Sequence, residues 1–449
     1  MIGARERILA MVGCFSAGTL AVGAKAAGPA LVIWTVVVIA YLALCRPNFR
    51  SIMSDLSKPS APVVTLLVVA GYAALSALWA RYPQLAIAAG ATLAGVIISG
   101  KLLHSGLKQL APDASALVAG WFTIGLVCGG LILVLELLTN FAILRWMLET
   151  FPSFRPLRNS MLVEKNGRWI LTNMSIANWS VAAVSMAMWP AMLAVVSIAV
   201  RRARILLAIG LFALVAFMVL ISEHQTSQVG ILASLAAFGA ATIAPAAARR
   251  FFGAMCLLLV IVIVPLSYTA DRALRLSDAS WAQFTLKERF RIWGSVSEKY
   301  TTAPILGIGA NNTTNVETAY PVPFDGTPIT KHHPHNMILQ IWLELGAVGG
   351  ALLLIAGYQV FRVVNRLPPT VVPYVLATGV LTAIEGIATW NLWSTWFLSA
   401  VAMTMAFLFL GVRVAEHAGK GTYPAFFEIW LPQSLAAWYP DRSKSRSRA

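Results

Sequence analysis

Charged residues are scarce in this chain, and acidic ones are the scarcest. Only 12% of its 449 residues are charged, with 18 Asp and Glu against 34 Lys and Arg, whereas 58% are hydrophobic. The mean hydropathy is +0.74. One soluble core could not hide so much apolar surface, so the composition excludes an ordinary soluble globular protein and predicts an integral membrane protein.

Cysteine is also rare. The four cysteines lie far apart, within apolar segments and without CxxC spacing: Cys14, Cys45, Cys128 and Cys256. This pattern predicts neither a disulfide nor a cysteine-bound metal. The first apolar segment lacks an A-x-A-like cleavage site, so we expect it to be a retained helix and not a removed signal peptide.

Long apolar runs recur along the whole chain. A helix needs roughly 17 to 25 such residues to cross a bilayer. We interpret twelve runs as spans, near 8–25, 30–45, 62–80, 84–100, 116–139, 180–200, 205–221, 229–247, 252–269, 336–361, 370–392 and 394–412. The predicted fold is an all-α polytopic membrane protein.

The distribution of basic residues predicts the orientation of these spans. Lys and Arg gather in alternate short connections, which are typical of the cytoplasmic side. They include Arg5, Arg7, Arg46, Arg50, Lys58, Lys101, Lys108, Arg201, Arg202, Arg204, Arg249, Arg250, Arg362 and Arg366. We therefore expect both termini in the cytoplasm. Anionic inner-leaflet lipid explains most of the net charge of +16, which gives no reason to expect nucleic acid as a partner.

This topology divides the chain into four parts. Residues 1–269 would hold the first nine spans, with a long outer connection at 140–179. Residues 270–335 would form a large, partly helical outer loop, 336–412 the last three spans, and 413–449 a basic cytoplasmic or interfacial tail. Both outer connections are basic. Long translocated loops are not subject to the bias that keeps Lys and Arg in cytoplasmic connections, which would explain these basic residues. Alternatively, the two loops bind an anionic substrate, and the sequence leaves both interpretations open.

Arginines are concentrated in the middle of the larger outer loop. Arg289 and Arg291 lie two residues apart and just before Trp293. On a helix they cannot share a face, so one is expected to face a site and the other solvent or headgroups. Arginine suits a diphosphate because its planar fork donates two hydrogen bonds and stays charged, and Arg272 and Lys331 are further candidates. The alternative is an amphipathic helix lying on the membrane.

Histidines cluster where this loop enters the tenth apolar run. His332, His333 and His335 are three of the six histidines in the chain. Pro334 is typical of the first helical position, which would place His335 and Asn336 in the first turn. The positive helix end disfavours imidazolium, so His335 is expected to be a neutral general base. Backbone N–H groups there, with Asn336 and His332, are expected to bind substrate.

Three imidazoles so close together raise the question of a metal ion. Pro334 interrupts the cluster, the chain has no HExxH motif, and the outer loop has no cysteine. A zinc site needs three or four converging ligands. The sequence therefore favours a site without a metal or another cofactor.

Three glycines follow in the same apolar run. Gly346 lies about three helical turns after His335, so we expect it on the same face, roughly 16 Å deeper in the membrane. Gly349 and Gly350 would widen the notch. Either the glycines permit close helix packing or they form a groove for a lipid chain below the histidine.

These residues resemble a known signature. His335-Asn336, nine further residues, Gly346, two residues and Gly349 are similar to the H-[NSQ]-x9-G-x2-[GTY] pattern of the O-antigen ligases of Gram-negative bacteria. The resemblance extends to the layout of twelve helices with a large outer loop between the ninth and tenth.

Two further elements of this family have counterparts upstream. Arg289-x3-Trp293 resembles its Arg-x3-Trp element, and the stretch from Pro304 through Gly307 to Gly309 resembles its proline-led glycine turn. One element departs. Where many relatives have a Ser-Arg-Gly-like segment, this chain has Thr226-Ser227-Gln228-Val229-Gly230, so Arg272 or Arg168 would have to supply the missing charge.

The resemblance implies a membrane glycosyltransferase of lipopolysaccharide assembly. It would move O-antigen polysaccharide from undecaprenyl diphosphate to a sugar hydroxyl of lipid A-core, at the periplasmic face of the bacterial inner membrane. His335 would be the base, and Arg289, with Arg291, Arg272 or Lys331, would bind the diphosphate. No carboxylate pair of the retaining type is evident, so we expect inversion at the anomeric carbon.

Other functions remain open at this point. O-antigen polymerases and protein O-oligosaccharyltransferases belong to the same superfamily, although no large outer C-terminal domain is evident to receive a protein. A secondary transporter or flippase is suggested by acidic residues within predicted helices, namely Glu136, Glu344 and Glu385. No inverted repeat supports that interpretation.

Overall fold

The computed structural model describes residues 4–44, 47–151, 162–165, 168–198, 203–313 and 333–418. The predicted basic tail at 413–449 therefore lies mostly outside the described residues, as does part of the large outer loop. Within the described ranges the chain is helical except for turns and one antiparallel hairpin, β1 (Leu162–Lys165) with β2 (Arg168–Leu171).

A helix is present at each of the twelve predicted spans. These helices are α1 (Ala4–Val22), α2 (Ala27–Leu44), α4 (Ala61–Leu75), α5 (Pro83–Lys108), α6 (Pro112–Leu138), α8 (Asn178–Ile198), α9 (Arg204–Ile221), α10 (Gln225–Ile243), α11 (Pro245–Tyr268), α13 (Met337–Val364), α14 (Val372–Ala388) and α15 (Thr395–Ala418). In the described part, 10 helical segments are long and apolar enough to cross a membrane. The chain is an all-α, multi-pass membrane protein.

Two of the twelve helices fall outside that set of ten. α14 has only 17 residues, and α1 carries Arg5, Glu6 and Arg7 within its first two turns. The prediction of twelve full spans is thus too high by this measure. The apolar pattern located both helices correctly, but it did not register the shortness of α14 or the charges at the start of α1.

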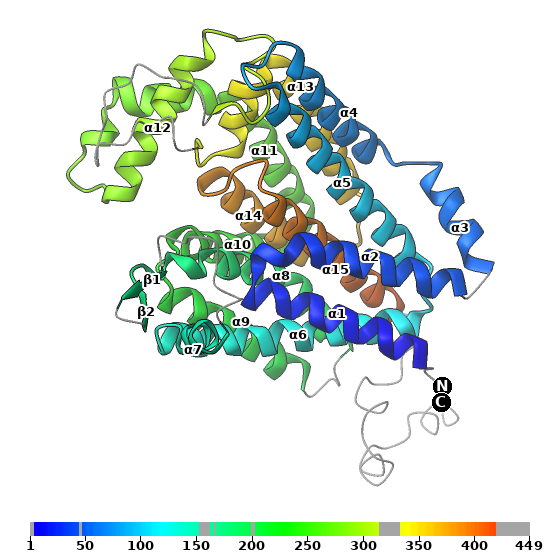
Figure 1. Ribbon diagram of the computed structural model, residues 1–449. Coiled ribbons are helices and arrows are strands. Elements are labelled where there is room, and N and C mark those ends of the chain that lie inside the picture. The colour runs from blue at the N-terminus through cyan, green and yellow to red at the C-terminus, as the bar shows by residue number, and fades with distance from the viewer. Residues whose placement is uncertain are drawn as a thin grey trace.

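Three further helices lie between the apolar ones: α3 (Pro47–Leu56), α7 (Ala142–Thr150) and α12 (Phe284–Tyr300). α12 agrees with the expectation of a partly helical loop between the ninth and tenth spans. Figure 1 shows α12 and the β1–β2 hairpin at one side of the molecule and α3 at the opposite side. This separation fits the predicted outer and cytoplasmic connections, and the orientation itself stays a prediction.

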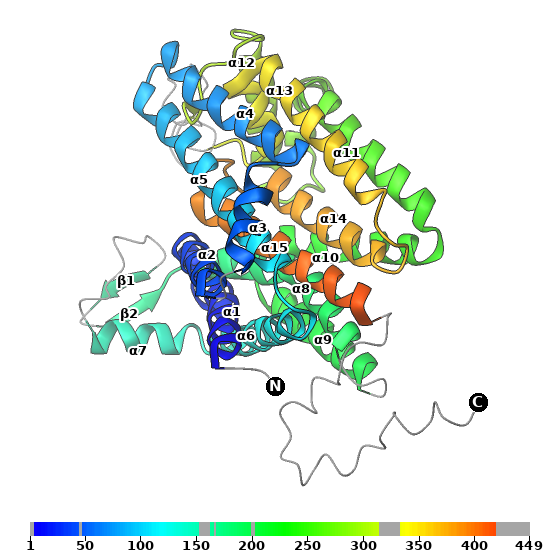
Figure 2. The same ribbon diagram turned by 90° about the vertical axis from the view of Figure 1, so that its right-hand side faces the viewer.

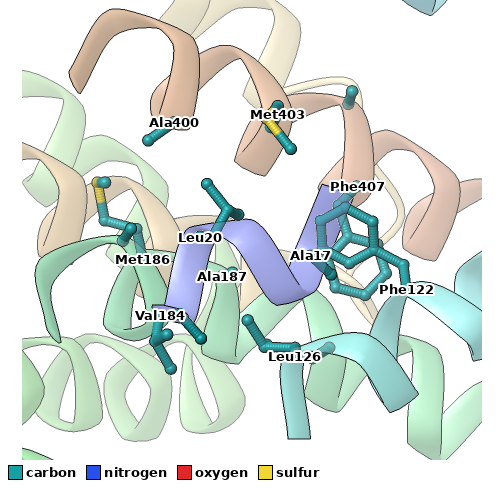
Figure 3. Packing of buried hydrophobic residues seen from close by; sticks show 14 of the residues in the cluster. Ala17, Leu20, Phe122, Leu126, Val184, Met186, Ala187, Ala400, Met403 and Phe407 are labelled. Carbon is teal, nitrogen blue, oxygen red and sulfur yellow. The ribbon is translucent and has the colours of Figure 1, made fainter. Parts of the chain in front are cut away.

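The main core lies where α1, α6, α8 and α15 meet. Ala17 and Leu20 of α1 lie close to Phe122 and Leu126 of α6 (Figure 3). The rings of Phe122 and Phe407 are 4.1 Å apart between centroids. One face of α1 is therefore buried in the main core, whereas Met11 and Phe15 on the other face are exposed.

A second group of helices leads toward the outer loop. α13 packs against α4 on one side and α11 on the other, and Figure 2 shows the three helices side by side. α14 packs along α10. α12 packs against α11 and α13, and Thr285 in its first turn donates to Gln225 at the start of α10, so the candidate site lies where these helices meet.

Several basic residues that we assigned to loops lie inside helices. Lys101 and Lys108 belong to α5, where both pair with Asp55 of α3 at 2.6 and 2.8 Å. Arg249 belongs to α11 and donates to the carbonyls of Asn365 and Leu367. The connections are therefore shorter than predicted, and the long basic side chains reach polar groups beyond their own helix from within it.

Candidate active site

The histidine that the sequence singled out precedes its helix and is not part of it. α13 begins at Met337, and Asn336 is its N-cap, with its side-chain oxygen accepting from the N–H groups of Ile338 and Leu339 at 3.1 and 3.0 Å. The prediction that Pro334 starts the helix is therefore wrong, because asparagine in an extended conformation is the better cap. Those two N–H groups are used by Asn336, so they do not form the predicted phosphate site.

The side chain of His335 is fixed by a backbone carbonyl. His335 adopts a left-handed conformation (φ 52°), and its Nδ1 lies 2.9 Å from the carbonyl oxygen of Thr389. A carbonyl can only accept, so Nδ1 carries the hydrogen in this contact. In the neutral ring Nε2 then holds the lone pair, which is the arrangement of a general base.

α12 is tied directly to this histidine loop. The indole nitrogen of Trp293 donates to the carbonyl oxygen of Pro334 at 2.9 Å. Arg289 lies one helical turn earlier on α12, on the same face as Trp293. The two sequence elements Arg289-x3-Trp293 and His335-Asn336 therefore meet in space.

The other predicted arginines have different partners. Arg291 lies on another face of α12 and donates to Asp278 at 3.2 Å. Arg272 pairs with Glu298 at 2.8 Å and with Asp271 at 3.3 Å. Both arginines hold α12 to the segment before it, whereas the spacing of Arg289 and Arg291 predicted only that one of them faces solvent or headgroups.

A buried hydrogen-bonded chain adjoins Arg289. Ser227 donates to Glu385 at 2.5 Å, and the Nδ1 of His224 lies 2.7 Å from the Ser227 hydroxyl. Because the Ser227 hydrogen points to Glu385, His224 Nδ1–H donates to Ser227. The second oxygen of Glu385 accepts from the indole of Trp390 at 3.0 Å.

Charge and burial act together on this chain. Burial, with a smaller contribution from the Arg289 charge, lowers the pKa of His224 to about 3. Burial also lowers the pKa of Arg289, whereas the charge of Glu385 opposes this effect. Arg289 makes no ion pair with the rest of the described residues, so its guanidinium is a candidate for an anionic substrate group.

The chain of contacts continues from Glu385 to His335. Thr389, whose carbonyl holds His335, donates its hydroxyl to Thr226 at 2.6 Å. Thr226 and Ser227 are neighbours in the first turn of α10. The sequence analysis missed His224 and the contact between Ser227 and Glu385. Ser227 was noted only as part of the segment that departs from the family pattern, and 158 residues separate it from Glu385.

Gly346 is a break in α13, not one position on a continuous face. Its backbone angles, φ 62° and ψ −160°, lie outside the helical region. The turn from Pro304 to Gly309 occupies the break: the N–H groups of Ile308 and Gly309 donate to carbonyls of α13 at 3.1 and 2.9 Å, and Ala347 N–H donates to Pro304 at 2.9 Å. The expectation that His335 and Gly346 share a helix face is therefore wrong.

A buried carboxylate secures the same turn. Glu344 accepts from the backbone of Asn311 at 2.7 Å, from the hydroxyl of Thr313 at 2.6 Å, from Gln340 at 3.1 Å and from the indole of Trp393. With so many donors, Glu344 has a structural role. This arrangement joins the glycine turn to α13.

The remaining glycines favour packing over a lipid groove. A Cβ added to Gly350 would lie 2.7 Å from the indole of Trp342, and one added to Gly349 would meet Ile341 and Leu345. Side chains of the same helix therefore fill the notch. Trp342 in turn donates to the carbonyl of Val260 on α11 at 2.8 Å.

Comparison with known sequences identifies the segment that carries this site. Residues 210–354 match the family described as O-antigen ligase. This segment is an O-antigen ligase domain. It supplies His224, Arg289 and His335, whereas Glu385 of α14 and Thr389, the residue that caps the end of α14, lie outside it. The resemblance found in the sequence is confirmed.

Curated relatives match a similar share of the chain. A protein of Rickettsia felis named "Putative polysaccharide ligase" is 30% identical over 138 residues, which are 28% of this chain and 32% of the relative. A protein of Rickettsia prowazekii with a similar name is 32% identical over 115 residues, which are 24% of this chain and 28% of the relative. The chain thus matches about a third of the length of these relatives.

Gln228, which stands where many relatives of the family have an arginine, has a structural role in the O-antigen ligase domain. Gln228 donates to the carbonyls of Val219 and Ser222 at 3.3 and 3.2 Å, at the end of α9. It therefore closes a helix end. Of the two arginines proposed to replace its charge, Arg272 is paired with Glu298 and Asp271, and Arg168 lies on β2.

Two predicted substrate contacts, Lys331 and His332, lie outside the described residues. His333 is described: its ring lies 4.1 Å from that of His335, and its Nδ1 accepts from the backbone of His335 at 3.1 Å. Within the described ranges no three His, Cys, Asp or Glu side chains of the O-antigen ligase domain or its surroundings gather as metal ligands.

Proposed function

We propose that this protein is a metal-independent glycosyltransferase that joins a polysaccharide to a lipid-linked sugar. The donor would be O-antigen on undecaprenyl diphosphate, and the acceptor a sugar hydroxyl of lipid A-core. The reaction would take place at the periplasmic face of the bacterial inner membrane. The observation that carries the proposal is the contact of His335 Nδ1 with the Thr389 carbonyl, beside the helix of Arg289.

In the proposed step His335 acts as the general base. Nε2 takes the proton of the acceptor hydroxyl as its oxygen attacks the anomeric carbon. His224 also holds an Nε2 lone pair, but its side chain is only 4% exposed and cannot reach an acceptor as His335 can. The half-buried His335 combines a fixed tautomer with access to substrate.

Arg289 serves the leaving group. The bond between the anomeric carbon and the diphosphate oxygen breaks, and the electron pair leaves with undecaprenyl diphosphate. A guanidinium held near a buried carboxylate stays charged and can donate bidentately to that anion. One displacement inverts the anomeric configuration, and the energy of the donor linkage makes a nucleotide unnecessary.

The acidic residues that suggested a transporter are mostly bound to groups with a structural role. Glu136 accepts from the backbone N–H groups of Ile143 and Leu144 and so caps α7, and Glu344 secures the glycine turn. Only Glu385 lies in the candidate site, where Ser227 and Trp390 bind it. These contacts favour transfer over a proton-coupled transporter.

The test is transfer by the purified full-length protein in lipid nanodiscs, with defined lipid-linked glycan and lipid A-core. We expect His335→Ala to abolish transfer without lowering the unfolding temperature much. The matched control is His417→Ala, since His417 also directs Nδ1 to a carbonyl, that of Arg413 at 2.7 Å, but lies at the far end of α15. Full activity of His335→Ala would disprove the assignment.

The same reaction separates the related activities. Product on lipid A-core supports a ligase, whereas longer lipid-linked glycan made without that acceptor supports a polymerase. A glycosylated protein would support a protein O-oligosaccharyltransferase. Inclusion of a chelator tests the metal-independent part of the proposal, because loss of transfer would contradict it.

A further inference from the structure

A polar cavity is lined by residues other than those of the candidate active site. It has a volume of about 390 Å³ and is formed by the start of α7, the segment after β2 and the α9–α10 turn. Its lining includes Asn140, Arg145, Asn173 and Glu223. A cavity of this size is within the range of pockets that bind small ligands.

The walls of the cavity are held in place by specific contacts. Glu136 caps α7 through two backbone N–H groups, and α7 packs on β2. Asn140 is held in a left-handed conformation (φ 52°). Asn173 accepts from Ser175 N–H at 2.8 Å, which orients its amide and leaves the NH₂ group as donor. Such fixed positions preorganise a binding site.

The polar groups of the cavity suit hydroxyl groups. Arg145 donates weakly to the Thr139 carbonyl at 3.3 Å, and its buried Nε has no hydrogen-bond partner among the described residues. Glu223 offers a carboxylate and the two asparagines offer amides, so paired donors and acceptors face one space. One guanidinium and one carboxylate balance in charge, which favours a neutral ligand over an anion.

The cavity also has an apolar part. Leu171 and Met174 line it together with the polar groups. A sugar ring presents hydroxyl groups at its edge and C–H groups on its face, so it matches both kinds of lining. A phosphate or a lipid headgroup would leave this apolar surface unused.

The cavity adjoins the candidate active site through the chain itself. Glu223 lines the cavity, and the next residue, His224, begins the buried chain to Ser227 and Glu385. α10 is linked to α12 on its other side, where Gln225 donates to Gln283 at 2.6 Å. A glycan seated here could therefore extend toward His335.

We propose that this cavity is an oligosaccharide-binding subsite, which engages several hydroxyl groups of one glycan a short distance from the reacting sugar. The part that assigns this glycan to the transfer reaction rests on the proposed function. Two sources share the chemistry: the acceptor sugar chain and the donor polysaccharide.

Binding tests the subsite without catalysis. Full-length protein in nanodiscs is titrated with lipid-free core oligosaccharide and, separately, with lipid-free O-antigen oligosaccharide, and followed by saturation-transfer NMR. We expect Arg145→Met and Glu223→Gln each to weaken binding of one glycan about tenfold, the effect of one charged hydrogen bond. Arg168→Met is the matched control, because it removes the same charge from β2 outside the cavity lining.

Kinetics then identifies the source of the glycan. If the subsite holds the acceptor, both cavity variants raise the KM for the acceptor about tenfold and leave kcat and the donor KM unchanged; if it holds the donor chain, the donor KM rises instead. Unchanged binding in both variants, or equal loss in Arg168→Met, overturns the proposal. Glu223→Gln keeps the test valid if Arg145→Met unfolds, since Glu223 is exposed.

Binding without transfer by the wild-type protein would separate the two proposals. In that case the cavity binds glycan, and the proposed ligase activity fails. If the wild-type protein carries out transfer but the cavity variants keep unaltered binding and KM values, the proposed ligase activity stands and the proposed subsite fails.

Discussion

Replacing Gly346 by alanine should damage both stability and activity. Its φ of 62° and ψ of −160° belong to a region that is essentially restricted to glycine, and a side chain there adds strain of about 1–3 kcal/mol. The added Cβ would also meet the carbonyl of Ile305 and the N–H of Gly307. Overpacking of this kind adds about 1–3 kcal/mol, so we expect a total near 4 kcal/mol.

The assay is thermal unfolding of the full-length protein in nanodiscs, followed by tryptophan fluorescence, with transfer measured on the same samples. The control is Gly379→Ala on α14, because nothing lies within 4 Å of a Cβ at that position. In a regular helix this change should be neutral or stabilising by about 0.5–1 kcal/mol.

The two variants should therefore move the unfolding temperature differently. We expect Gly346→Ala to lower it by several degrees and to lose transfer, since the break positions the turn that Glu344 secures. An unfolding temperature equal to that of the wild type would refute the argument that the turn needs this break. Equal losses in both variants would show a general intolerance of alanine.

Three further predictions concern single charges. Arg289→Ala should lower transfer about 100-fold, whereas Arg291→Ala, which loses only a solvent-exposed pair with Asp278, should have little effect; similar losses would contradict the assignment. Burial, and then Arg289, lowers the pKa of His224 from 6.5 to about 3, so the free energy of unfolding should fall by up to about 1.4 kcal/mol per pH unit as the pH drops from 6.5 toward 3. The variant His224→Gln should show a smaller dependence of the unfolding temperature on pH in this range. Equal pH dependence in the variant and the wild type would disprove this prediction. Hydrogen bonds from Lys101, then Lys108 and Ser105, lower the pKa of Asp55, so Asp55→Asn should remove about 2 kcal/mol of stability at pH 7. This difference should start to shrink below about pH 4, where Asp55 of the unfolded chain becomes protonated while Asp55 of the folded chain stays charged, and should shrink further with each step toward lower pH; a constant difference across pH would argue against the charge.

The positions of the apolar helices could be predicted because each depends on a local run of side chains. All twelve runs are helices. The helix ends were less predictable, since Arg249 and Lys101 reach polar groups from inside their helices. The meeting of the Arg289-x3-Trp293 element with the histidine loop, through Trp293 and Pro334, was suggested by the resemblance to a family and not by any local pattern.

The details of the site depend on competition between local rules and on distant contacts. Proline favoured an earlier start for α13, but the capping bonds of Asn336 decided the position. The sequence around Gly346 is compatible with a continuous helix, and only the contact with the turn that begins at Pro304 shows why the helix breaks there. Glu385 was interpreted as an acid within a membrane helix, but its partner Ser227 lies on α10 and its neighbour His224 caps the start of that helix. No spacing in the sequence reveals such contacts.

The partner that orients His335 is a main-chain carbonyl, so side-chain mutagenesis cannot remove it. Thr389→Ala would delete a hydroxyl bond to Thr226 yet keep the acceptor for Nδ1. An alanine scan would therefore show no effect of Thr389 on the tautomer of His335, although the Thr389 carbonyl would still be the group that fixes it. A change in the backbone position at the end of α14 would break the hydrogen bond to Nδ1 of His335. A different side chain at position 389 would leave this hydrogen bond in place, provided that the backbone does not move.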